Sequence, residues 1–280
     1  MSATDTTIVI DDMPVPFKPG QTILEAALEA GVYIPHLCAH PEFAPHGSCK
    51  LCNVIVNGRN AAACTMKASP GQEVEVDTPD LQAYRRTLVQ MLFVEGNHFC
   101  PGCEKSGNCQ LQALAYDSEM MTPHFVEFYP HRPVDASHPD VLLDFNRCIQ
   151  CELCVRASRD VDGKSVFALA GRGMASHIIV NSPSGKLGDT NFSVTDKAAH
   201  VCPVGAILVK RVGYAVPIGE RRYDLEPISE EATRCAVEEA KLARPLKPPR
   251  CRKCGSRRPR SPGASAATCR FSTSTSAFST

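Results

Sequence analysis

The grouping of the cysteines constrains this chain more than any other feature of its sequence. Most of its 15 cysteines stand in groups, in which neighbours are separated by only a few residues. The N-terminus carries neither the basic start nor the apolar stretch of a secretory signal, so we expect a cytoplasmic protein in a reducing compartment. Disulfides are disfavoured there, and isolated buried cysteines do not group in this way. The groups therefore predict metal centres.

Four cysteines with the spacing C-x10-C-x2-C-x11-C form the first group. Four thiolates this close in sequence suit a [2Fe–2S] cluster, in which each iron binds two sulfur ligands. The first interval is longer than the four residues usual in plant-type ferredoxins. A structural zinc ion, which uses the same thiolates, is the alternative. The predicted ligands, called the Cys38 set below, are Cys38, Cys49, Cys52 and Cys64.

Three cysteines and a histidine form the second group, within the stretch EGNHFCPGCEKSGNC. Three cysteines leave one iron of a [4Fe–4S] cluster without a protein ligand. A neutral imidazole is a good iron ligand, and His98 is the nearest. Asp117 or a remote cysteine is the alternative fourth ligand. The predicted ligands, called the His98 set, are His98, Cys100, Cys103 and Cys109.

The third group is a C-x2-C-x2-C run followed by a distant Cys-Pro pair, the signature of bacterial ferredoxins. Two-cluster ferredoxins carry a second ligand set, but here Ser158, Phe192, Thr195 and Ala198 stand at its four positions. The chain therefore predicts one [4Fe–4S] cluster in this region, with zinc as the alternative. The predicted ligands, called the Cys148 set, are Cys148, Cys151, Cys154 and Cys202.

Patterns around the cysteines predict an α+β protein. Strands are expected at 6–12, 15–20 and 72–76, a helix at 21–31, and a hairpin at 52–64 with its turn at Asn57-Gly58. This unit resembles a plant-type ferredoxin with a β-grasp fold. Thr78 and Pro79 begin a helix that Gly96 ends, and a second helix is expected at 109–117. Residues 117–145, which hold four prolines, are expected to be irregular.

Four regions follow from these patterns. We predict a [2Fe–2S] ferredoxin-like domain at 1–78, a short helical His/Cys [4Fe–4S] segment at 79–118, a bacterial ferredoxin-like [4Fe–4S] domain at 119–225, and a tail at 226–280. The tail composition predicts disorder. Its codons also permit a frame slip after about residue 250: read one base earlier, they can encode a segment that resembles the start of a [NiFe]-hydrogenase small subunit.

Several kinds of chemistry are not indicated. The chain has no Walker-type phosphate loop, and AGRGMAS at 170–176 is predicted to be a turn, because Ser176 stands where a third glycine belongs. No Ser/His/Asp or H-E-x-x-H grouping appears. A formal charge of +0 and the lack of a long apolar run argue against nucleic-acid and membrane partners. Closed ligand sets favour electron transfer, so no catalytic residue is predicted.

The motifs YIPHLC, GSCKLCNV, FVEGNHFCPGCEKSGNCQLQ, CPVGAIL and KRVGYAVPIGERRY are similar to those of the small diaphorase subunit of soluble NAD-reducing [NiFe]-hydrogenases, over about residues 5–225. The order of the three groups also resembles the N-terminal part of the large iron–sulfur subunit of complex I. The H-x-C spacing at His98 departs from the H-x3-C of complex I and agrees with the narrower family.

This resemblance implies an electron-transfer subunit with one [2Fe–2S] and two [4Fe–4S] clusters, held by the three sets named above. Its partners would be the small and large subunits of a [NiFe]-hydrogenase and a diaphorase subunit that carries FMN and the NAD site. One alternative is the electron-input subunit of complex I or of an NAD-linked formate dehydrogenase. A zinc-bound structural protein is the alternative from another class.

Overall fold

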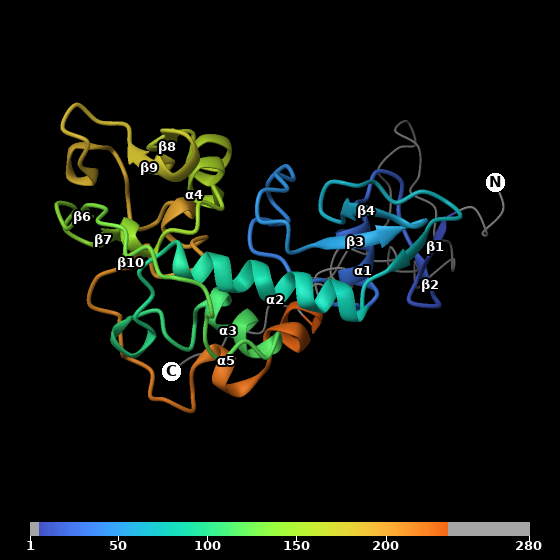
Figure 1. The fold of residues 1–280 in the computed structure, drawn as a ribbon. Helices are drawn as coiled ribbons and strands as arrows, with labels where there is room; N and C mark the ends of the chain where they lie inside the picture. The colour runs from blue at the N-terminus through green and yellow to red at the C-terminus, as the bar shows by residue number, and fades with distance from the viewer. Residues whose placement is uncertain (1–5, 235–280) are drawn as a thin grey trace, which may run out of the picture. The chain divides into compact units, whose positions relative to one another are not determined.

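The computed structural model describes residues 6–234 (Figure 1). The predicted tail covers 226–280; its residues 235–280, which include the predicted frame slip after about residue 250, lie outside the described part. Within residues 6–234, no helix is long and apolar enough to cross a membrane.

The N-terminal region is a five-stranded sheet with helix α1 packed on it (Figure 1). The strand order is β2-β1-β5-β3-β4, in which only the β1–β5 pair is parallel. Alternate residues of β1 and β3 point into a core beneath α1, as the alternating sequence predicts. The elements are β1 (Thr7–Ile10), β2 (Met13–Pro16), α1 (Ile23–Glu29), β3 (Asn53–Val56), β4 (Arg59–Ala62) and β5 (Glu73–Glu75).

Local signals explain the ends of these elements. Thr22 begins α1 through a reciprocal capping box with Glu25. Asn57 and Gly58, at φ of 48° and 76°, make the tight turn between β3 and β4. Each expected element of this region is present, and its bounds differ from the expected ranges by a few residues.

The middle region consists of two helices joined by the segment that holds the His98 set. Helix α2 (Pro79–Val94) begins at Thr78, whose hydroxyl accepts a hydrogen bond from the Leu81 amide at 3.2 Å. A short helix, η1 (Cys100–Gly102), and helix α3 (Gln110–Asp117) follow. The sequence predicted both the long helix α2, which carries a start signal, and the short helix α3, which has apolar periodicity.

One buried arginine of α2 attaches this helix to the N-terminal region. Arg85 is 2% exposed and donates to the carbonyl oxygens of Leu51 at 3.2 Å, Val76 at 2.8 Å and Asn53 at 3.0 Å. Leu51 and Asn53 flank Cys52, so Arg85 also supports the loop of the Cys38 set.

We expect Arg85→Met to destabilise the chain strongly. Three carbonyl groups would lose their donor, which costs about 3 kcal/mol and lowers the thermal midpoint by roughly 6–12 °C. Calorimetry of the metal-loaded chain measures this shift. Arg59→Met, at an exposed position on the edge strand β4, serves as the control and should change the midpoint by no more than about 2 °C. Equal shifts in the two variants would contradict the role of Arg85.

The third region carries the Cys148 set between small sheets. A three-stranded sheet has the order β10-β7-β6, and β8 and β9 form a separate hairpin. The predicted turn at 170–176 is confirmed, since η4 (Gly173–Ala175) lies between β8 and β9. The other elements are β6 (Val134–Asp135), β7 (Val141–Asp144), η2 (Phe145–Arg147), α4 (Leu153–Arg156), η3 (Ala157–Val161), β8 (Phe167–Ala170), β9 (His177–Val180), η5 (Leu187–Asp189), η6 (Lys197–Ala199), β10 (Ile207–Val209) and α5 (Arg222–Leu225).

Two differences from the sequence prediction stand out. Strands β6 and β7 lie within 117–145, so the expectation of an irregular segment is wrong there. Val141 and Leu143 are both fully buried on one face of β7. This alternation covers too few residues to predict a strand in a segment that holds four prolines. Ile228 is also buried against the core that holds α3, so packed structure continues beyond residue 225.

Candidate metal centres

The Cys38 set comes together in one place. Cys38 lies in the loop after α1, Cys49 and Cys52 lie in the loop before β3, and Cys64 follows β4. The thiol of Cys38 interacts with those of Cys49 and Cys64, and the thiol of Cys52 interacts with that of Cys64. These mutual interactions hold the pKa of Cys38 and Cys52 below the ordinary value and raise the pKa of Cys49 and Cys64.

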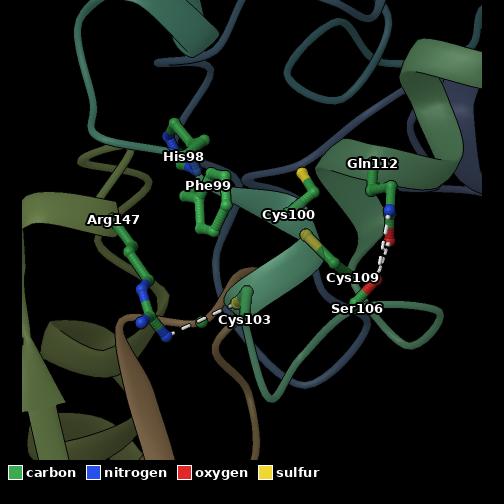
Figure 2. Close-up of a pocket in the computed structure, with 9 residues that line it drawn as sticks. His98, Phe99, Cys100, Cys103, Ser106, Cys109, Gln112 and Arg147 are labelled. Carbon is green, nitrogen blue, oxygen red and sulfur yellow. Dashed lines mark hydrogen bonds between the residues drawn. The ribbon is translucent and has the colours of Figure 1, made fainter.

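The three cysteines of the His98 set line one small cavity together with His98, Phe99 and Arg147 (Figure 2). Cys100 begins η1, Cys103 ends it, and Cys109 directly precedes α3. Burial raises the pKa of Cys100, and it raises that of Cys109 to about 12. In Figure 2 the three thiols gather at one side of the cavity, and the Phe99 ring is drawn between them and His98.

His98 has the properties of a ligand, although it does not touch the thiols. Its Nε2 atom is buried and has no hydrogen-bond partner within the described chain. Burial, with a smaller contribution from the charge of Arg147, lowers the pKa of His98 to about 4. The imidazole is therefore neutral at pH 7, which is the form that binds a metal. An imidazole with an unpartnered buried nitrogen, on the wall of the cavity that the three cysteines line, fits a bound cluster.

The Cys148 set lies on a tight loop and on the segment that precedes β10. Gln150 and Glu152 adopt left-handed backbone conformations, with φ of 53° and 56°, which fold the C-x2-C-x2-C run back on itself. The Gln150 amide donates to the Cys148 sulfur at 3.4 Å. Burial raises the pKa of Cys148 to about 11 and raises those of Cys151 and Cys154 well above the ordinary value. These thiols are therefore neutral while no metal is bound, and a metal that binds them would displace their protons.

Three of the four positions of a second bacterial-type ligand set serve the packing of this region instead. Ser158 is fully buried, and its hydroxyl accepts a hydrogen bond from the Val166 amide at 2.8 Å. Phe192 is buried edge-on against Phe167, with ring centroids 5.5 Å apart. Ala198 is also fully buried. These residues fill the interior and offer no metal ligand.

Hydrophobic cores connect the three sets. Cys38 and Cys151 share one core, and Cys109 lies in another with Cys148, Cys202 and also Cys49 of the Cys38 set. The Gln110 amide donates to the Pro203 carbonyl at 2.8 Å, which joins the His98 set to the Cys148 set. The Cys148 set is therefore the neighbour of both other sets.

Sequence reasoning missed the side chains that connect the sets. Arg147 donates from Nη1 to the Cys103 sulfur at 3.4 Å and pairs with Glu104 at 2.9 Å. A side chain at Gly205 would come within 2.8 Å of the same sulfur, so glycine is needed there. Gly205 is part of the Cys-Pro-Val-Gly motif, so the sequence did contain this glycine. The spacing of the motif alone could not show that the glycine lies against the Cys103 sulfur.

The donor types of the three sets are those that hold iron–sulfur clusters, namely thiols and one imidazole. Within residues 6–234, no three His, Cys, Asp or Glu side chains are grouped as the ligands of a single metal ion are.

Comparison with known families supports this chemistry over most of the chain. Residues 3–79 match the 2Fe-2S iron-sulfur cluster binding domain, residues 85–124 match the NADH-ubiquinone oxidoreductase-G iron-sulfur binding region, and residues 141–209 match the 4Fe-4S single cluster domain. The chain is therefore an iron–sulfur protein with one [2Fe–2S] domain and with [4Fe–4S] domains, and its predicted α+β, ferredoxin-like class is confirmed at this level.

Whole-chain comparisons narrow the class. The chain is 42% identical over 226 residues to "NAD-reducing hydrogenase HoxS subunit gamma" of Cupriavidus necator, which covers 80% of this chain and 96% of that protein. A chain of the solved "Crystal structure of NAD+-reducing [NiFe]-hydrogenase in the H2-reduced state" is 55% identical, with a TM-score of 0.78, and covers 81% of this chain and 98% of that one. This protein belongs to the family of NAD-reducing hydrogenase gamma subunits, which are parts of an oxidoreductase complex.

A second group of relatives consists of much longer proteins. The chain is 32% identical to "NADH dehydrogenase [ubiquinone] iron-sulfur protein 1, mitochondrial" of Solanum tuberosum over 72% of this chain, but it spans only 27% of that protein. The predicted relationship to the large iron–sulfur subunit of complex I is thereby confirmed for the shared region.

Proposed function

We propose that this chain relays electrons between a [NiFe]-hydrogenase module and a diaphorase subunit that carries FMN and the NAD site, so that hydrogen oxidation drives NAD reduction. The observation that carries the proposal is the use of the cysteines. All 11 cysteines of the described chain belong to the three ligand sets, and the Cys148 set adjoins both others. The small and large hydrogenase subunits and the diaphorase subunit are the proposed partners.

The residues have distinct tasks in this proposal. The Cys38 set would hold a [2Fe–2S] cluster, and the His98 and Cys148 sets would each hold a [4Fe–4S] cluster. When bound, these clusters supply one-electron carriers. The protein would hold the ligands, which are buried or half-buried, and set their separation. Since the Cys148 set comes last in the chain but adjoins the other two, we place it in the middle of the relay.

Metal analysis tests the ligand assignment. The intact chain, purified without oxygen, should contain about ten irons and about ten acid-labile sulfides. About six of each would mean that one [4Fe–4S] site is empty, and His98 would be the first ligand to doubt. Zinc with little sulfide would contradict electron transfer and favour the structural alternative.

Copurification tests the partners. We expect the chain to copurify with hydrogenase and flavin-containing subunits, in a fraction that reduces NAD with hydrogen. Reduction that depends on formate, or activity recovered only with membranes, would favour the alternative complexes. This assay tests the proposed partners, and its result does not depend on the iron content measured above.

A further inference from the structure

Arg156 is a buried arginine that lies between two of the ligand sets. It stands at the end of α4 and is 5% exposed. Its Nη2 atom donates to the carbonyl oxygen of Cys38 at 2.6 Å and to that of Cys151 at 3.2 Å. Its Nη1 atom donates to the carbonyl oxygen of Ala44 at 3.0 Å. One guanidinium group thus joins the backbone of the Cys38 set to that of the Cys148 set.

This guanidinium has no carboxylate partner among residues 6–234. The nearby carboxylates bind elsewhere: Glu152 lies 3.2 Å from the His46 ring, and Asp160 pairs with Arg159 at 2.6 Å. The polar partners of Arg156 are backbone carbonyls, and the Phe43 ring lies 5.9 Å from the guanidinium carbon.

A buried cation without a counter-ion is costly, so this position calls for nearby negative charge. The Cys38 and Cys148 sets each offer a backbone carbonyl to the same nitrogen of this guanidinium. Their thiols become thiolates when metal binds, and four thiolates around an iron–sulfur core leave a net negative charge. The two loaded sets would therefore supply the charge that the protein does not provide through a carboxylate.

We propose that Arg156 is a positioning residue that fixes the separation of the Cys38 and Cys148 sets and raises the reduction potential of the clusters in both. This inference rests on the proposed function. Reduction adds one electron to a cluster and makes no bond in the protein, so a nearby fixed cation favours the reduced form. Because the guanidinium contacts both ligand backbones, its charge should act on both clusters and only weakly on the cluster of the His98 set.

The test is a redox titration of the intact chain followed by electron paramagnetic resonance, with Arg156→Gln and Arg156→Lys. In Arg156→Gln, the reduced-to-oxidised ratio at a fixed potential should fall about tenfold for the clusters of the Cys38 and Cys148 sets, which equals ~59 mV for one electron. Arg156→Lys keeps the charge and should stay within about threefold of the unsubstituted chain. Arg159→Gln, an exposed neighbour paired with Asp160, should change nothing.

Each outcome decides the matter. Loaded clusters with unchanged potentials in Arg156→Gln would overturn the inference, as would a lysine variant whose potentials fall as far as those of the glutamine variant. If Arg156→Gln fails to hold its clusters, loaded Arg156→Lys with unchanged potentials supports the inference, and loss of iron from both variants overturns it in favour of a purely structural role. Absence of clusters from the unsubstituted chain would contradict the proposed function itself, and this inference with it.

Discussion

Cys202→Ala should lower the iron content of the chain from about ten to about six, with an equal loss of sulfide. Cys202 is the only predicted ligand of its set that lies outside the loop 148–154, and it shares both hydrophobic cores that surround the Cys148 set. Its removal leaves one iron of the cluster without a protein ligand, because the methyl group of alanine cannot bind iron. Since this set adjoins both others, hydrogen-dependent NAD reduction by the assembled complex should also fall below detection.

Thr195→Ala is the matched control for this substitution. Thr195 stands at a ligand position of two-cluster ferredoxins, but it is exposed, and its hydroxyl bonds to that of Ser193 at 2.8 Å. We expect its iron content and spectra to remain those of the unsubstituted chain. Ten irons in Cys202→Ala, or a loss in Thr195→Ala, would contradict the ligand set and the proposed absence of a second bacterial-type cluster.

The sequence was sufficient wherever a few neighbouring residues determine the outcome. Thr78 and Pro79 begin α2 because capping depends on groups within one turn. The three cysteines at 148–154 signal a metal loop through spacing alone. The same reasoning could not find the β7–β10 pair, whose short strands are separated by more than 60 residues and carry no joint signal. It could not reveal which set adjoins which.

Arg156 illustrates this limit well. Its carbonyl partner at Cys38 lies 118 residues away in the chain, and arginines are usually exposed. Only the fold shows that this guanidinium is buried between two ligand loops. Arg147 is similar, because its contact with the Cys103 sulfur spans 44 residues. Sequence patterns therefore supplied the candidate ligands, whereas the side chains that contact and connect their loops required the structure.

Gly96→Ala should cost the chain about four irons, although the residue is not itself a ligand. Its backbone is outside the left-handed region, so alanine meets no strain of φ and ψ there. The added Cβ would instead lie 2.3 Å from Nε2 of His98, a distance that no real contact allows. The imidazole must move, and if His98 is the fourth ligand, the cluster of the His98 set should be lost.

A double substitution separates this effect from general damage. If Gly96→Ala acts through the imidazole, His98→Ala should lose the same four irons, and the two changes together should lose no more, because they remove one ligand between them. Asn97→Ala is the control. The side chain of Asn97 is exposed, and the hydrogen bond from its backbone amide to the Asn146 carbonyl, at 2.7 Å, does not depend on the side chain. Full iron content in His98→Ala with an unaltered spectrum would instead show that this imidazole is not a ligand, and the fourth ligand would have to be sought at Asp117 or a remote cysteine.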